Sequence, residues 1–193
     1  MKKIFLLISI IFISCNSDSG LEKQYETIYR MQITENEKFN KILQQAINVK
    51  KRELENSDLL LSIEKYDSLT KNHLEYLTII ENEIREKGNE IFFEGDLFSV
   101  KGKEFISKSK QYNFEIAKLI SSKNLRARVG FVFNMNDIES DDKIYFNYLD
   151  YYFRGYPKVH TLFFISNMKR RTLEFENEFI DEIIINKRGV FAN

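Results

Sequence analysis

Apolar side chains recur every three or four positions along four stretches of the chain, which is the period of an amphipathic helix. The spacing predicts helices over about residues 20–54, 58–87, 100–122 and 157–187. The first two are expected to be about 45 to 50 Å long at 1.5 Å per residue, joined by a short turn as an antiparallel hairpin. The pattern predicts a mainly all-α fold, a four-helix bundle with two long N-terminal helices.

One apolar face of each predicted helix is expected to point into the core. On the first helix the polar residues Gln32 and Glu35 interrupt this face, and Ile33 covers the gap from the neighbouring side. The predicted inward residues of the first helix are Leu21, Tyr25, Ile28, Phe39, Ile42, Ala46 and Val49. Those of the other three helices are Leu59, Ile63, Tyr66, Leu69, His73, Leu77, Ile80 and Ile84; Phe105, Tyr112, Ile116 and Leu119; and Leu162, Ile165, Leu173, Phe179 and Ile183.

Capping residues and turn residues mark where these helices begin and end. Gly88 is suited to the end of the second helix, and Pro157 to the first turn of the fourth, where its missing N–H costs no hydrogen bond. The predicted N-terminal caps are Ser19 with Glu22 at capping-box spacing, Ser57 or Asp58, and Ser99.

The segments between the helices have no helical period. Residues 89–103 contain turn residues between apolar ones, which indicates a folded connection or a small β-hairpin. Before the last helix, residues 126–133 form a candidate strand, 136–142 are acidic and polar, and 145–156 are rich in aromatic side chains. We therefore expect an irregular insertion, with a candidate strand, before the last helix.

The first 15 residues have the order of a bacterial lipoprotein signal. Lys2 and Lys3 precede an apolar run over residues 4–13, and Ser14 stands directly before Cys15. The run is about half of the roughly 20 residues that a helix needs to cross a bilayer, so residues 1–14 are interpreted as a cleaved signal. Residues 12–15 resemble a lipobox, with Phe where Leu is usual. The alternative is an ordinary secreted protein in which the cysteine occurs by chance.

Cleavage is expected to make Cys15 the first residue and the lipid attachment site of the mature protein. Diacylglycerol on the thiol and an acyl chain such as palmitate on the amino group suffice for stable membrane attachment. Residues 15–19 are then a polar tether and 20–193 one bundle domain, since removing 14 of the 193 residues leaves 179, a usual single-domain length. We favour the periplasmic face of the outer membrane over the inner membrane.

The charge balance of the mature chain excludes one class of partner. Loss of Lys2 and Lys3 leaves 27 of the 29 basic residues against 29 acidic ones, which gives no electrostatic basis for binding nucleic acid. Cys15 is the only cysteine, so the chain has no internal disulfide. We expect no cofactor other than the covalent lipid on Cys15.

Side chains that support catalysis or hold a metal are few. His73 lies on the apolar face of the second helix, where a core imidazole is more common than a ligand, and His160 has no partner at metal spacing. Residues 136–142 offer oxygen ligands for Ca²⁺ but lack the spacing of an EF-hand, so a solvated loop is favoured. For the basic residues 169–171, a solvated or salt-bridged helix face is favoured over phosphate or lipid binding. We predict no metal site and no enzymatic activity.

Seven aromatic residues fall within twelve positions just before Pro157. If this segment is helical, Phe146, Leu149 and Phe153 share one face, and the phenylalanines are expected to point inward while the tyrosine hydroxyls point outward. The predicted partner-binding residues are Tyr148, Tyr151 and Tyr152, because tyrosine is common at binding hot spots. The alternative is that all seven rings only cap the core.

Three stretches, taken in order and spacing, resemble the N-terminal helical-bundle domain of the GldM (PorM) family, periplasmic shaft proteins of gliding motility and type IX secretion. The stretches are residues 66–69 leading into 76–77, residues 93–96 followed by 101–105, and residues 152–153 before Pro157 with Glu176 on the last helix. The resemblance implies a helical bundle with a protein-interaction role in the cell envelope. That family begins with a transmembrane helix and continues into β-rich domains, whereas this chain has a lipoprotein signal and stops after the fourth helix.

These observations lead to two functional hypotheses. The first is a lipid-anchored, non-catalytic interaction or structural module whose partner is an envelope protein of a gliding or secretion complex. The alternative is an envelope lipoprotein that binds a small or lipidic ligand between its helices. A closed, side-chain-filled core favours the first, and a cavity of several hundred Å³ favours the second.

Overall fold

The computed structural model describes residues 18–55, 60–119 and 142–187, and it confirms the predicted mainly α fold. The elements are α2 (Asp18–Glu53), α3 (Leu60–Lys87), η2 (Asn89–Phe92), β1 (Phe93–Glu94), β2 (Leu97–Phe98), α4 (Val100–Leu119), α6 (Asp142–Phe153) and α7 (Lys158–Lys187). The predictions for residues 1–15, the caps Ser57 and Asp58, the strand 126–133 and the acidic stretch before Asp142 fall outside the described residues. Within the described ranges, every helix is too short or too polar to cross a membrane.

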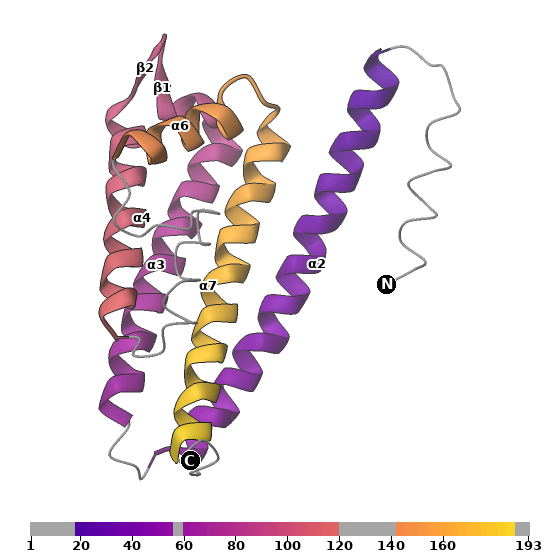
Figure 1. Cartoon of the computed structure of the whole chain (residues 1–193). Helices are drawn as coiled ribbons and strands as arrows, with labels where there is room; N and C mark the ends of the chain where they lie inside the picture. Colours follow the sequence, from indigo (N-terminus) through magenta and orange to yellow (C-terminus); the bar gives the residue numbers. More distant parts are fainter. Residues whose placement is uncertain (1–17, 56–59, 120–141, 188–193) are drawn as a thin grey trace.

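The long helix α7 lies at the centre of the bundle. It packs against α2 on one side and α3 on the other, and α4 packs against α3 (Figure 1). α6 crosses one end of the bundle, beside the β1–β2 hairpin, and the first turns of α2 lie at this same end (Figure 1). α2 and α3 do not pack as the expected helical hairpin, because α7 lies between them.

The main hydrophobic core lies between α3, α4, α6 and α7. Most of the apolar positions predicted for α3, α4 and α7 are buried or partly buried there, whereas Ile63 and Leu173 belong to a second cluster and Leu59 falls outside the described residues. Full burial of each large apolar side chain contributes about 1.5–3 kcal/mol. A smaller cluster joins α2 to the lower halves of α3 and α7. Its members are Ile47, Leu54, Ile63, Leu173 and Ile180.

A glycine ends α3 as predicted, and a small hairpin follows. Gly88 has a positive φ of 86°, and its N–H donates to the carbonyl oxygen of Ile84 at 2.9 Å. Because an L side chain is strained at this φ, glycine is the residue that ends a helix in this way at least cost. β1 and β2 then pair antiparallel with Phe93 opposite Phe98, which confirms the expected hairpin.

The start of α4 depends on close packing against η2. The Oγ of Ser99 accepts a hydrogen bond from the N–H of Gly102 at 3.0 Å, so Ser99 caps the helix as predicted. A Cβ at Gly102 would lie 2.4 Å from the carbonyl oxygen of Phe92. Only glycine allows α4 to approach η2 this closely.

α7 begins one residue later than predicted. The carbonyl oxygen of Pro157 accepts hydrogen bonds from the N–H groups of His160 at 2.9 Å and Thr161 at 3.4 Å. Pro157 is therefore the residue that precedes the first turn, and the helix starts at Lys158.

The prediction of the inward face of α2 is wrong, because the buried positions are displaced by one residue along the sequence. Tyr25, Ile42 and Val49 were expected in the core, but they are 57%, 65% and 54% exposed. The buried face instead carries Ile33, Asn36 and Ile47, with Leu43 partly buried, and each of these follows a position of the predicted face or its polar gap by one residue. A shift of one residue rotates a helix face by about 100°.

Polar side chains on the buried face of α2 explain the error. Asn36 is buried, and its Nδ2 donates to Ser166 Oγ at 3.1 Å and to Asn167 Oδ1 at 2.9 Å. Lys51 Nζ lies 2.7 Å from Glu176 Oε1 and also pairs with Asp67. From the sequence alone, Asn36 and Lys51 are expected to face solvent. In the fold, polar side chains on α3 and α7 form hydrogen bonds and ion pairs with them.

Candidate functional site

The aromatic segment before Pro157 forms α6 and the turn into α7. Leu149 and Phe153 are buried and Phe146 is partly buried against the core, as expected from their shared helix face. Tyr151 points away from the core and is 68% exposed. α6 therefore closes one end of the bundle with one face and presents tyrosine on another.

Two of the predicted partner-binding residues, Tyr151 and Tyr152, differ in how far they are exposed to solvent. Tyr151 is exposed, whereas Tyr152 is half-buried and packs on Phe164 of α7 with ring centroids 4.8 Å apart. The rings of Tyr151 and Tyr152 meet edge to face at 4.8 Å. The side chain of Tyr148 falls outside the described residues. Whether the three residues bind a partner stays a prediction.

Further aromatic contacts connect α6 to the start of α7 and to Tyr29 in the N-terminal half of α2. The ring of Phe164 lies 4.9 Å from His160, and His160 stacks on Tyr156 with centroids 4.2 Å apart and an interplanar angle of 15°. Tyr29 of α2 meets the other side of this cluster, edge to face with His160 at 5.2 Å. His160 is thus a buried part of an aromatic cluster that joins three segments of the chain.

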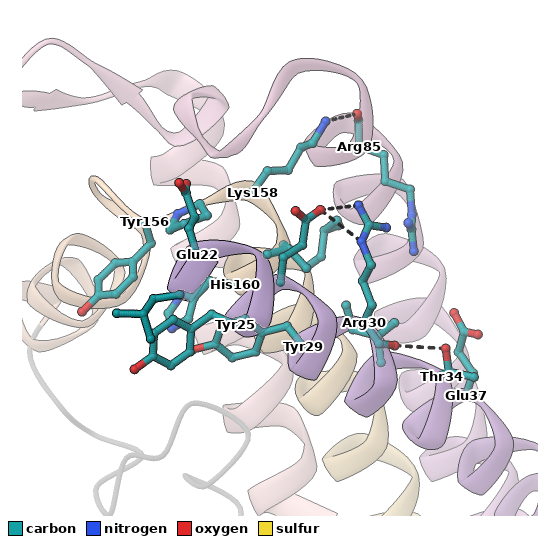
Figure 2. A pocket seen from close by; sticks show the side chains of 16 residues that line it. Glu22, Tyr25, Tyr29, Arg30, Thr34, Glu37, Arg85, Tyr156, Lys158 and His160 are labelled. Carbon is teal, nitrogen blue, oxygen red and sulfur yellow. Dashed lines mark hydrogen bonds and ion pairs between the residues drawn. The ribbon is translucent and has the colours of Figure 1, made fainter. Parts of the chain in front are cut away.

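This aromatic cluster forms one end of a cleft of about 840 Å³. The cleft lies between the N-terminal half of α2, the end of α3 and the start of α7 (Figure 2). Its apolar and aromatic lining residues are Leu21, Tyr25, Tyr29, Ile33, Tyr156, Pro157, Val159, His160 and Leu162.

Charged side chains line the rest of the cleft, except for Glu22, which lies beside Tyr156 and His160 at the aromatic end (Figure 2). Arg30 Nη2 pairs with Glu26 Oε1 at 2.6 Å, and Lys158 Nζ donates to the carbonyl oxygen of Arg85 at 2.9 Å (Figure 2). The lining contains three carboxylates, Glu22, Glu26 and Glu37, and three cations, Arg30, Arg85 and Lys158. The formal charge of the lining is therefore zero at neutral pH.

Burial keeps the polar aromatic groups of the cleft neutral. It lowers the pKa of His160 below its ordinary value, although a hydrogen bond with the backbone of Tyr152 opposes this shift. It also raises the pKa of Tyr29, with smaller contributions from Tyr156 and Tyr25. His160 Nδ1 is buried and makes no hydrogen bond with the described residues.

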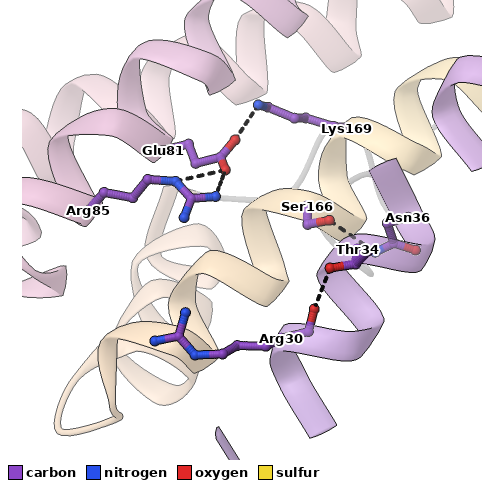
Figure 3. Close-up of polar contacts among 7 residues, drawn as sticks. All are labelled: Arg30, Thr34, Asn36, Glu81, Arg85, Ser166 and Lys169. Atoms are coloured by element: carbon purple, nitrogen blue, oxygen red, sulfur yellow. Dashed lines mark hydrogen bonds and ion pairs between the residues drawn. The ribbon is translucent and has the colours of Figure 1, made fainter. Parts of the chain in front are cut away.

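Polar contacts next to the cleft fix the helices that form it (Figure 3). Asn36 joins α2 to Ser166 on α7, and Glu81 on α3 accepts hydrogen bonds from Lys169 on α7 and from Arg85. Burial raises the pKa of Glu81, but the hydrogen bonds and positive charges of Lys169 and Arg85 outweigh it, so this pKa lies below the ordinary value. Glu81 therefore stays ionised and holds α3 to α7.

The basic residues at 169–171 are all paired. Lys169 pairs with Glu81, and Arg170 and Arg171 lie 2.8 Å and 3.0 Å from oxygens of Glu174. This is the salt-bridged helix face that was favoured over a phosphate or lipid site. Among the residues that the structure describes, no group of three or more His, Cys, Asp or Glu side chains is placed to hold a metal ion.

Sequence reasoning missed the cleft. It assigned Leu21 and Tyr25 to the core, and treated His160 only as an unsuitable metal ligand. The cleft depends on the one-residue rotation of α2 and on the position of α7, which are tertiary features. One available signal was the set of aromatic residues at the start of α2, opposite those around Pro157.

The described residues define a helical-bundle domain with an aromatic end and a charged-rimmed cleft. The family model for the GldM N-terminal domain matches residues 13–186. This match covers most of the chain, so the chain belongs to the GldM N-terminal domain family, as the resemblance implied. Members of this family are envelope-associated and function in complexes with other envelope proteins in gliding motility or type IX secretion. No curated protein matches the chain.

Proposed function

We propose that this protein is a lipid-anchored envelope protein that acts as a non-catalytic interaction module in a gliding-motility or type IX secretion complex. The observation that carries the proposal is the family match over residues 13–186. The lipid on Cys15 holds the N-terminus at the membrane, on the periplasmic face of the outer membrane. The partner is another envelope protein.

The proposed docking surface is the tyrosine face of α6, formed by Tyr148, Tyr151 and Tyr152. The exposure of Tyr151 supports this choice, because an aromatic ring with a polar hydroxyl contributes large contact area at an interface. The inward face of α6 is occupied by Leu149 and Phe153, so the helix stays fixed while its tyrosine face makes contacts.

Changing Tyr148, Tyr151 and Tyr152 together to Ser should abolish recovery of the partner from native membranes while leaving helical content nearly unchanged. Because Tyr152 packs on Phe164, a small loss of thermal stability is expected, and Tyr151→Ser alone should retain stability and still weaken recovery. Co-purification followed by mass spectrometry measures the partner, and circular dichroism measures the fold.

The control for this experiment changes exposed apolar residues at other places on the bundle. Leu61→Ser with Phe114→Ser removes two exposed side chains, 77% and 49% accessible, without altering α6. Partner recovery should persist in this variant. If the control variant and the tyrosine variants recover the same amount of partner, the proposed docking surface on α6 is wrong.

The cleft supports a second function, binding of an amphipathic ligand. Its volume of about 840 Å³ lies within the roughly 300–1,000 Å³ of typical ligand sites, and its lining combines apolar and aromatic walls with a few charged groups. This is the alternative that a large cavity was expected to favour. Saturable binding of an uncharged single-chain amphiphile tests it.

A further inference from the structure

The cleft at the N-terminal half of α2 is amphipathic along its length. Tyr25, Tyr29, Tyr156 and His160 gather at one end, and Arg30, Thr34, Glu37 and Arg85 lie toward the other (Figure 2). A ligand that fills the cleft must therefore have an apolar part and a charged part.

The apolar end has the properties of a site for an alkyl chain. Leu21 and Tyr25 line it and are 47% and 57% exposed, so apolar surface faces water at the cleft wall. Val159 and Leu162 of α7 are buried and also line the cleft. Covering this surface releases water and gains about 25 cal/mol per Å² of apolar area. The aromatic rings add polarisable contact surface.

The charged end has the properties of a site for a zwitterionic head group. Lys158 has only a backbone carbonyl as partner among the described residues. Arg30 and Arg85 pair with Glu26 and Glu81, and their side chains remain 67% and 45% exposed. These three cations suit a phosphate, which guanidinium groups bind through paired hydrogen bonds. Glu37 forms no ion pair with the residues described and suits an ammonium group.

The length of the cleft matches an extended acyl chain together with its head group. Its lining on α2 runs from Leu21 to Glu37, about 24 Å at 1.5 Å per residue. Each leaflet of a bilayer gives an acyl chain about half of the roughly 30 Å hydrocarbon core. A chain and its head group therefore fit end to end along α2.

We propose that this cleft binds a single-chain zwitterionic phospholipid, with its acyl chain at the aromatic end and its phosphate at Arg30, Arg85 and Lys158. This inference rests on the second proposed function, ligand binding in the cleft. It adds the chemical class of the ligand and its orientation. It is independent of the docking surface on α6.

A fluorescent reporter in the cleft tests the proposal directly. The chain has no tryptophan, so Tyr25→Trp places a unique reporter in the cleft, and Val49→Trp places one at a similarly exposed site outside it. The protein is the mature chain, residues 15–193, with Cys15→Ser so that it stays unacylated. The probe is lysophosphatidylethanolamine with a brominated acyl chain, kept below its micelle concentration.

Saturable quenching is expected at Tyr25→Trp and is expected to be absent at Val49→Trp. Monoacylglycerol with the same brominated chain should bind at least tenfold more weakly, because it lacks the phosphate and the ammonium. Adding Arg30→Gln and Lys158→Gln should weaken the phospholipid at least fivefold and leave the monoacylglycerol affinity unchanged.

The two probes distinguish recognition of the phospholipid head group from binding of any ligand in the cleft. Equal affinity for the two probes at the cleft reporter overturns the head-group assignment and leaves ligand binding in place. Absence of quenching by both probes, or equal quenching at both reporters, overturns both.

Discussion

At the residue scale, two buried ionisable side chains respond to pH in opposite directions. Burial lowers the pKa of His73 to about 3, and its ring stacks on Tyr112 with centroids 4.0 Å apart. Burial also raises the pKa of Glu176 to about 7, although the hydrogen bond and charge of Lys51 oppose the shift. The sequence placed His73 correctly on a core face, but it contains no sign that Glu176 is buried.

His73→Phe should remove an acid-dependent loss of stability. Between pH 6.5 and 3 the unfolded chain binds a proton at His73 that the folded protein does not, so this residue destabilises the fold as the pH falls. The free energy of unfolding of the variant, relative to the unchanged protein, should rise by about 2–3 kcal/mol from pH 7 to pH 4.5. Urea unfolding at the two pH values measures it.

Glu176→Gln is a control for this measurement, and its stability should change with pH in the opposite direction. Between pH 4.5 and 7 the folded protein holds a proton at Glu176 that the unfolded chain releases, so the carboxyl group favours the fold as the pH falls. The free energy of unfolding of Glu176→Gln, relative to the unchanged protein, should therefore fall from pH 7 to pH 4.5. A change of the same sign in both variants, or no change with His73→Phe, would contradict the assignment.

At the element scale, the sequence predicts α3, α4 and α7 well and α2 only in extent. The apolar residues of the inward faces of α3 and α7 keep a clear helical period, which identifies these faces although polar side chains such as Thr70 and Glu176 are also buried on them. On α2, Asn36 and Lys51 occupy the buried face because Ser166 and Glu176 pair with them across the chain. A local hydrophobic pattern does not reveal contacts between residues far apart in the sequence. The pattern therefore favours the neighbouring, more apolar face of α2.

Two isoleucines on α2 test which face is buried. Ile47→Ala should reduce the free energy of unfolding by about 2–5 kcal/mol, because Ile47 is fully buried between α2, α3 and α7 and its truncation leaves a cavity. Ile42→Ala should change it by less than about 0.5 kcal/mol, since Ile42 is 65% exposed. Chemical denaturation measures both, and the reverse ranking would restore the face predicted from the pattern.

At the scale of the whole molecule, the start of α2 and both proposed sites lie at one end of the bundle. Three peptide units separate Cys15 from Asp18, the first residue of α2, and span at most about 11 Å. The first turns of α2 and α6 lie at that end of the bundle (Figure 1). The cleft begins there, because Leu21 of α2 and Tyr156, directly after α6, line it. The sequence predicted the anchor and the tyrosines separately, whereas their proximity follows from the direction of α2 and the crossing of α6. A lipid on Cys15 therefore keeps the tyrosine face and the cleft close to the bilayer.

Cys15→Ala should release the protein from the membrane, because the acylated thiol is the proposed anchor and the described helices contain no membrane span. The expected product is an unprocessed precursor or a soluble periplasmic protein that incorporates no fatty-acid probe during metabolic labelling. The bundle should keep its thermal stability, since Cys15 precedes α2, the first helix of the bundle. Labelling and fractionation of the unchanged protein, which should carry the probe and sediment with the outer membrane, provide the control. Persistent label on the alanine variant would show that lipid attaches elsewhere, and the membrane-proximal placement of the tyrosine face and the cleft would then lose its basis.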